Sequence, residues 1–228
     1  MKIKMIALIS LLLHSAATAT NYPGRIAPLG WPGVTLNGNP CWGHSRAYGP
    51  YDYRKTTPEN HNLVESYHFT PEVEALVRGK SASVGGDIDY TLRAFPNHPR
   101  ALWAYVRLHL SRDRDEYQEQ KRQQAQSGGA PPECYFNRAL VAIPDDPIVS
   151  KIYGIYLHRV GELEEAMNQY QRAETGMEGD AELAYNMGLL YFELGDISEA
   201  KRYAMKAERL GYPLQGLQRK IGRQEGGG

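Results

Sequence analysis

The sequence has only two cysteines among 228 residues, Cys41 and Cys134, and they lie far apart in the chain. Their number and separation exclude repeated C-x-x-C metal-binding pairs and a haem-attachment pair. The sequence also contains no recognisable Ser-His-Asp order and no glycine-rich nucleotide-binding loop. We therefore expect no enzymatic activity, no catalytic residues, no cofactor and no metal ligands among the site residues.

An excess of charge of either sign is also missing, because 26 basic residues balance 26 acidic ones. A protein that binds nucleic acid needs a strongly basic surface to attract the phosphate backbone. The balance of charge therefore gives no indication of a nucleic-acid partner.

The only long apolar run lies at the beginning of the chain, in residues 1–19, MKIKMIALISLLLHSAATA. Two lysines precede an apolar stretch from Met5 to Leu13, and a small-x-small site ends at Ala19, a layout typical of a cleaved secretory signal peptide. The stretch is too short to span a bilayer. We therefore expect a periplasmic or secreted protein, cleaved near Ala19 and without stable membrane insertion of the mature chain.

Export determines what the two cysteines do. In an oxidising compartment two cysteines most often pair, and Cys41 has only Cys134 as a partner. We expect this disulfide, while a buried free thiol at each position is the alternative that the sequence leaves open. In the chain-entropy model, a bridge across a loop of this length contributes about 4 to 5 kcal/mol to stability.

The carboxyl-terminal half contains an internal repeat. Between Pro147 and Pro213, four features recur at a spacing of 34 residues: Gly154 with Gly188, Gly161 with Gly195, Ala166 with Ala200, and Ala173 with Ala207. The first glycine pair falls in the middle of helices, where glycine costs about 1 kcal/mol relative to alanine unless a neighbouring helix needs the room. The second glycine pair ends the first helix of each unit, because left-handed capping geometry favours glycine. The alanines let the second helix approach its neighbours closely.

This pattern resembles the tetratricopeptide repeat, a helix-turn-helix unit that stacks into a superhelix. The resemblance implies an all-α fold, a right-handed superhelix of helical hairpins, with about four pairs over residues 70–213. Upstream, similar short segments around Ala94 and Ala139 extend the pattern. These two alanines are 45 residues apart, so the unit between them is 11 residues longer than the 34-residue repeat. We place this excess in residues 112–132, as an overlong exposed helix that ends in a loop.

Both ends of the predicted stack have their own signals. Thr70 precedes a proline and is expected to open the first helix with a hydroxyl cap. Residues 214–228 are expected to form a capping helix and a disordered glycine tail, with Leu214, Leu217 and Ile221 buried against the last unit.

Residues 20–69 are expected to form an irregular, aromatic-rich N-terminal cap. The segment contains prolines and glycines throughout and no convincing helical period, yet it is too aromatic for a disordered tail; residues 39–54 read NPCWGHSRAYGPYDYR. We expect its rings to cover the helical stack, with one contact at Cys41 and another at Trp42 or Tyr51. A lip that binds a sugar or a peptide is the alternative interpretation.

The resemblance also implies a function. Members of the family generally bind partners on the concave surface that is lined by the first helix of each pair. Carried over by position, the partner-binding residues here would include Lys151, Ile155, His158, Arg159, Tyr185, Leu189 and Phe192. An apolar strip between charges of both signs suits a peptide or protein segment. We therefore expect an exported protein-protein interaction or scaffold module of the cell envelope.

Two alternatives stay open. A metal-binding or enzymatic protein would have its site in residues 21–68, where His61, Glu65 and His68 would share one helical face and supply zinc ligands. In a further alternative, the N-terminal segment fills the concave groove until it is displaced.

The first testable prediction concerns the bridge. We expect Cys41 and Cys134 to be recovered as one disulfide-linked peptide pair when the mature protein is digested without reduction. Peptide mapping by mass spectrometry measures this, with a reduced and alkylated sample as the control. Recovery of both cysteines as free thiols in the unreduced sample would contradict the prediction.

Overall fold

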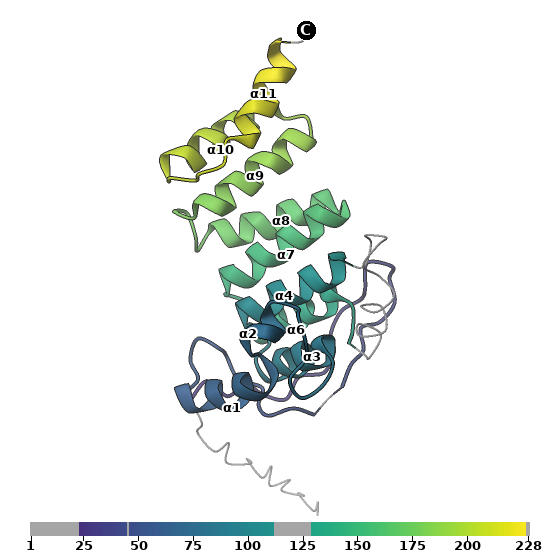
Figure 1. Ribbon diagram of the computed structural model, residues 1–228. Coiled ribbons are helices and arrows are strands. Elements are labelled where there is room, and N and C mark those ends of the chain that lie inside the picture. The colour runs from purple at the N-terminus through teal and green to yellow at the C-terminus, as the bar shows by residue number, and fades with distance from the viewer. Residues whose placement is uncertain (1–22, 45, 112–128, 227–228) are drawn as a thin grey trace, which may run out of the picture.

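The computed structural model describes residues 23–44, 46–111 and 129–226 (Figure 1). In these residues the regular structure consists of ten helices, without strands beyond two isolated bridges in the N-terminal segment. None of the described helices is long and apolar enough to cross a bilayer. An all-α fold is thereby confirmed. The expected signal peptide and most of the expected exposed helix at 112–132 lie outside the described residues.

The helices follow one another along an elongated stack (Figure 1). They are α1 (Pro58–His68), α2 (Pro71–Glu74), α3 (Val84–Ala94), α4 (Pro99–Leu110), α6 (Pro132–Ala142), α7 (Pro147–Val160), α8 (Leu163–Glu174), α9 (Ala181–Glu193), α10 (Ile197–Arg209) and α11 (Gly216–Gly226). The pairs α4/α6, α7/α8 and α9/α10 pack as successive hairpins, and α11 packs against the last of them. The result is a helical repeat with one pair after another.

The ends of the repeat helices follow their local sequence signals. Helix α7 begins at Pro147, after Asp146, whose carboxylate accepts hydrogen bonds from two amides of the first turn. Asp180 caps α9 through one such bond. After the two helices, Gly161 and Gly195 adopt φ angles of 89° and 82°, in the left-handed region that favours glycine. The role predicted for both glycines is confirmed.

The two mid-helix glycines lie where neighbouring helices approach most closely. A Cβ atom at Gly154 would be 2.5 Å from Cδ1 of Tyr170, and one at Gly188 would be 2.6 Å from Cδ2 of Leu217. Such distances are too short for carbon atoms in a packed interior. The four alanines of the repeat, Ala166, Ala173, Ala200 and Ala207, are also buried. Small residues at the 34-residue spacing therefore set the distances between helices.

The first unit departs from the repeat. Helix α2 is a single turn, and Thr70 occupies its N-cap position without a side-chain capping hydrogen bond. The contact between α1 and α3 is more extensive than the contact between α2 and α3. The chain leaves α2 through Leu76, which has a positive φ of 61°. Because α2 is a single turn, it buries little apolar surface, and Val73 is its one buried residue.

The expectation of an irregular segment over residues 20–69 is wrong for α1. Thr57 caps this helix by accepting a hydrogen bond from the amide of Asn60, and Pro58 occupies the first turn. Only Val64 of the helix is buried. The helix therefore lacks the apolar period that the sequence analysis required, although its capping signals are present.

The carboxyl-terminal helix also differs in part from the expectation. Leu217 and Ile221 are buried against the preceding pair, as predicted. Leu214 is 56% exposed, because it lies in the link before α11 rather than on its packed face. The helix extends to Gly226, into the expected glycine tail, and residues 227–228 lie outside the described residues.

The second testable prediction uses two helical glycines with opposite surroundings. Gly188→Leu should lower the free energy of unfolding by about 1 to 3 kcal/mol or more, because the side chain meets Leu217 and Tyr203. Gly222→Leu in α11 has open space around its Cβ position and replaces a poor helix former, so stability should hold or rise slightly. Urea denaturation of both variants measures the difference. An equal decrease in the free energy of unfolding for the two variants would contradict the close helix contact described at Gly188.

Candidate functional site

The predicted partner-binding residues lie on α7 and α9, the first helices of two successive pairs. Lys151 bridges the two helices, because its Nζ atom lies 3.0 Å from both Asp180 Oδ2 and Glu182 Oε2. Burial alone would lower the pKa of Lys151, but hydrogen bonds to these carboxylates outweigh burial and raise it. Lys151 therefore remains charged and holds α7 against the beginning of α9.

Two more of these residues also make contacts between helices. His158 Nε2 lies 3.2 Å from Glu193 Oε2 at the other end of α9. The guanidinium of Arg159, which is exposed, lies 5.6 Å from the centre of the Trp103 ring on α4. Contacts of these side chains therefore join α7 to α4 on one side and to α9 on the other.

Ile155 and Tyr185 belong to the packed interior. Each is only 8% exposed, and the Tyr185 ring stacks on Tyr212 with a centroid distance of 4.4 Å. These two residues fill space between helices and present almost no surface to a partner. Their positions in the repeat predicted contact with a partner, but the structure uses both side chains for packing.

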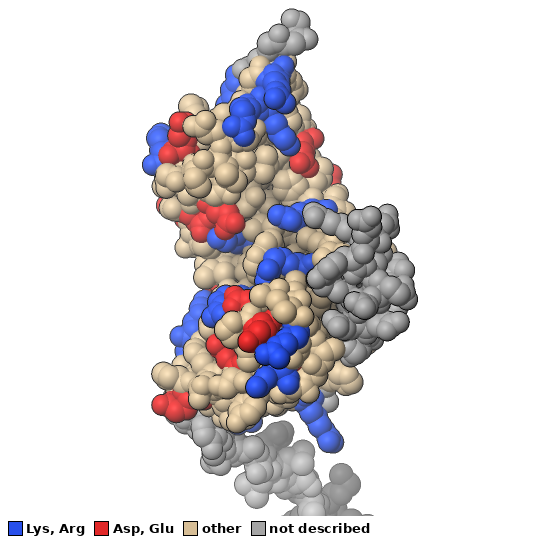
Figure 2. All heavy atoms as spheres, viewed as in Figure 1, with Lys and Arg blue, Asp and Glu red and all other residues tan. Residues whose placement is uncertain are grey.

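The remaining predicted residues, Leu189 and Phe192, lie partly buried on α9 and retain some surface. Lys220 Nζ of α11 lies 5.8 Å from the centre of the Phe192 ring. On the face seen in Figure 2, basic and acidic side chains alternate in small groups along the stack. We call Leu189 and Phe192 of α9, together with exposed Arg159 of the neighbouring helix α7, the α9 strip.

The N-terminal segment crosses the stack and is joined covalently to α6. Cys41 and Cys134 form a disulfide with an S–S distance of 2.00 Å, as predicted. Trp31 packs edge to face on Tyr135 of α6, with ring centroids 5.0 Å apart, and Arg138 lies 5.5 Å from the Trp31 ring centre. The expected contact of the segment at Cys41 is therefore present, and it lies on α6.

Other rings of the segment divide into buried and exposed ones. Tyr51 is 2% exposed, packs near Phe95, and donates its backbone N–H to the carbonyl of Ala94 at 2.9 Å. The predicted contact through Tyr51 is confirmed. Trp42 and Tyr67 stay largely exposed and do not act as cover. Tyr48 is partly covered, because its ring lies 5.3 Å from that of Tyr51 and its hydroxyl donates to Asn60 at 2.7 Å.

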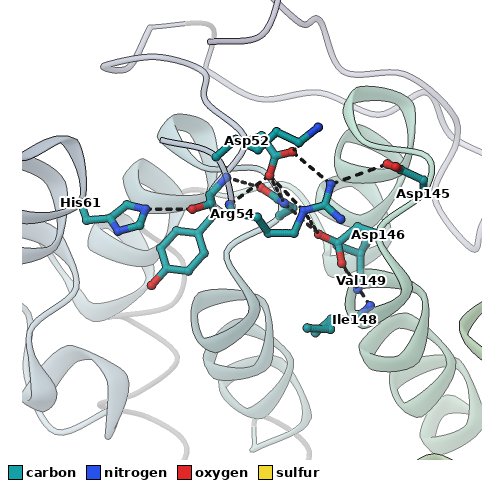
Figure 3. A network of polar contacts seen from close by, with 10 residues as sticks. Asp52, Arg54, His61, Asp145, Asp146, Ile148 and Val149 are labelled. Carbon is teal, nitrogen blue, oxygen red and sulfur yellow. Dashed lines mark hydrogen bonds and ion pairs between the residues drawn. The ribbon is translucent and has the colours of Figure 1, made fainter. Parts of the chain in front are cut away.

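A network of buried polar groups ties the segment to the junction between α6 and α7 (Figure 3). The side-chain amide of Asn97 donates to Asp52 and to Asp146, both at 2.8 Å. Arg54 donates two hydrogen bonds to Asp52, at 3.0 and 3.2 Å, and its Nε lies 3.3 Å from Asp146 Oδ2. The same Asp146 caps α7, so the segment and the helix share one carboxylate.

The electrostatics of this network determine how it responds to acid. Burial by itself would raise the pKa of Asp52, but hydrogen bonds from Arg54 and Asn97 outweigh it and lower the pKa below the ordinary value of 3.8. The unfolded chain therefore binds the proton more readily than the folded one. The stabilisation is present above the ordinary pKa and is lost as the pH falls through the folded value.

The residues considered as zinc ligands have separate partners. His61 Nε2 contacts the carbonyl oxygen of Tyr53 at 2.9 Å, and His68 Nδ1 contacts Asp87 at 2.9 Å. Glu65 accepts from His98 Nε2 at 3.2 Å, which lowers its pKa. Within the part of the chain that the structure describes, no three His, Cys, Asp or Glu side chains are grouped as a metal site.

His98 illustrates how these ring nitrogens are used. Its Nδ1 atom accepts a hydrogen bond from the Ala101 amide and thereby caps α4, so the proton lies on Nε2, which faces Glu65. Burial lowers the pKa of His98, although Glu65 opposes the shift. The ring is therefore a neutral structural cap, with both nitrogens engaged.

Comparison with known proteins gives no further guidance, because the chain matches no protein-family model and no curated protein sequence. The site must be interpreted from its own geometry. Sequence analysis missed Asp52, Arg54 and Asn97. Asp146 was recognisable as a cap because Pro147 follows it, but no local pattern indicates its contact with Arg54.

The third testable prediction removes the cation from this network. Arg54→Met leaves two buried carboxylates near each other, and because the Arg54 side chain is one-third exposed we expect a loss of about 2 kcal/mol at neutral pH. The loss should shrink as the pH falls below 3.8, where Asp52 in the unfolded chain is protonated. Urea denaturation across this pH range measures both effects.

The matched control is Arg78→Met. Arg78 pairs with Glu72 at 3.7 Å on the surface, where both side chains are well exposed, so its loss should change stability by less than about 0.5 kcal/mol. Equal effects of the two substitutions, or a loss at Arg54 that is independent of pH, would contradict the role assigned to the network.

Proposed function

We propose that the chain is an exported, tetratricopeptide-like interaction module of the cell envelope, which binds a peptide or protein segment on the face formed by α7 and α9. The right-handed superhelix implied by the resemblance is part of this proposal. The 34-residue register supports it, because the corresponding glycines and alanines of two successive units are all closely packed.

Export is supported by two independent features. The first 19 residues have the layout of a cleaved signal peptide. The Cys41–Cys134 disulfide is compatible with an oxidising compartment outside the cytoplasm. A periplasmic or secreted location is therefore proposed for the mature chain.

The observation that carries the binding proposal is the α9 strip. Leu189 and Phe192 offer apolar surface, and exposed Arg159 lies on the neighbouring helix. Lys151, His158 and their acidic partners hold the two helices in register beside this strip. A small apolar surface between fixed charges of both signs suits a peptide or helix.

The N-terminal segment leaves this strip open in the described residues. Its contacts lie on α6, at the end of α3 and at the beginning of α7. Helix α9 lies farther along the stack, beyond α7 and α8 (Figure 1). The strip is therefore available to a partner without displacement of the described part of the segment.

The fourth testable prediction is a capture experiment with matched variants. Purified protein, immobilised and exposed to the envelope fraction of the cells that produce it, should retain a partner polypeptide. Phe192→Ala and Arg159→Ala should each reduce this retention by about tenfold, because centrally placed aromatic and arginine side chains contribute most to binding. Quantitative mass spectrometry of the retained proteins measures the change.

Met205→Ala provides the control, because Met205 is an exposed apolar residue on α10. This variant should retain the same partner as the wild type. Retention that is unchanged by Phe192→Ala and Arg159→Ala, with both variants folded by circular dichroism, would refute the α9 strip as the binding surface.

A further inference from the structure

Two hollows at the edge of the stack share one aromatic lining residue, Trp42. They have volumes of about 570 and 390 Å³, and both are lined by Trp42 and Ala130. These volumes fall within the range of about 300 to 1,000 Å³ that is typical of small-molecule sites. The larger hollow extends to Glu133 and Tyr156, and the smaller one to Asp89.

Trp42 is 55% exposed, although its backbone is held firmly on both sides. The residue before it, Cys41, is bonded to α6. The residue after it, Gly43, packs so closely on Trp31 that a Cβ atom there would lie 2.2 Å from the indole ring. Trp31 Nε1 also donates to the carbonyl oxygen of His44 at 3.2 Å.

A ring presented in this way is suited to binding. An exposed aromatic side chain supplies a large contact area at a small entropic cost when its backbone is fixed. Packing of the N-terminal segment on the stack does not require the Trp42 indole, because Trp31 and Tyr51 already make that contact. The exposure of Trp42 is therefore not explained by packing.

The walls of the hollows carry acceptors in fixed positions. Glu133 is buried and accepts hydrogen bonds from the Leu36 amide and the Tyr156 hydroxyl, both at 3.0 Å. Asp89 in the smaller hollow accepts from the Tyr135 hydroxyl at 2.6 Å and from Arg93 Nε at 3.0 Å, so its charge is paired. Each carboxylate oxygen retains a lone pair for a further donor.

The charge of the walls restricts the ligand. Among the described residues that line the two hollows, none is lysine or arginine, whereas Asp89, Glu133 and Glu162 are acidic. The side-chain amides of Asn37 and Asn39 add neutral donors and acceptors to the larger hollow. Such a site disfavours anions and favours a ligand that has many hydroxyl groups.

We propose that Trp42 and the two hollows beside it bind a neutral saccharide of at least two sugar rings. The apolar C–H face of one ring lies on the indole, and hydroxyl groups of the flanking units reach the polar walls. The lining of this site contains no residue of the α9 strip, although Val160 follows Arg159 directly, and saccharide binding would be a second function of the chain. Its partner chemistry differs from that of the proposed peptide site, so each proposal can fail without the other.

The fifth testable prediction is a calorimetric titration of the full mature protein with cellotetraose, maltotetraose, chitotetraose and mannotetraose. At least one of these neutral saccharides should bind saturably at concentrations up to about 10 mM. Trp42→Ala should weaken that binding by about tenfold or more, and Trp42→Phe should restore much of it because the aromatic face is kept.

The control variants separate this site from other surfaces. Tyr67→Ala removes an equally exposed aromatic residue elsewhere in the N-terminal region, and Phe192→Ala alters the α9 strip; neither should change saccharide binding. The proposal is overturned if none of the neutral saccharides binds saturably, if Tyr67→Ala weakens binding as much as Trp42→Ala, or if tetragalacturonic acid binds more tightly than every neutral saccharide.

Discussion

Close contact between neighbouring helices at Gly154 and Gly188 is the constraint on which the rest of the stack depends. A side chain at either position would collide with an atom of the adjacent helix. Gly154 packs against Tyr170 of α8, and Gly188 packs against Leu217 of α11 and Tyr203 of α10. A separate contact joins α7 to α9, where Lys151 pairs with Asp180 and Glu182. The surface proposed for peptide binding therefore depends on two kinds of contact, the close packing at the two glycines and the ion pairs of Lys151 between α7 and α9.

The N-terminal segment is ordered by a different kind of interaction. An irregular segment has no repeating apolar face, so it cannot be fixed by hydrophobic burial in the way that a repeat helix is. Here a disulfide fixes one point, and the hydrogen bonds of Asn97 with Asp52 and Asp146 fix another. Burial of two carboxylates is unfavourable by itself, and Arg54 offsets this cost on the solvent side.

The sequence was most informative where the determinants are local or where only one choice exists. The caps at Gly161 and Gly195 follow from glycine conformation, and the disulfide follows from there being one pair of cysteines. Helix α1 was not predicted because its sequence has capping residues at the beginning but no periodic apolar face. For the candidate site, the sequence placed the proposed residues on what the structure shows to be α7 and α9, but whether Tyr185 packs inward depends on its contact with Tyr212. Contacts of Arg54 are likewise non-local, and no spacing rule predicts them.

The same contacts that attach the N-terminal segment also fix the position of its most exposed ring. If the segment served only as a cover, the hydrophobic effect would favour a conformation in which Trp42 turns onto the stack, as Tyr51 does. Instead the backbone is fixed immediately before Trp42 by the disulfide and immediately after it by Trp31. A ring held outward in this way loses little freedom when a ligand stacks on it, so the rigidity of the cover and the proposed binding have one physical origin.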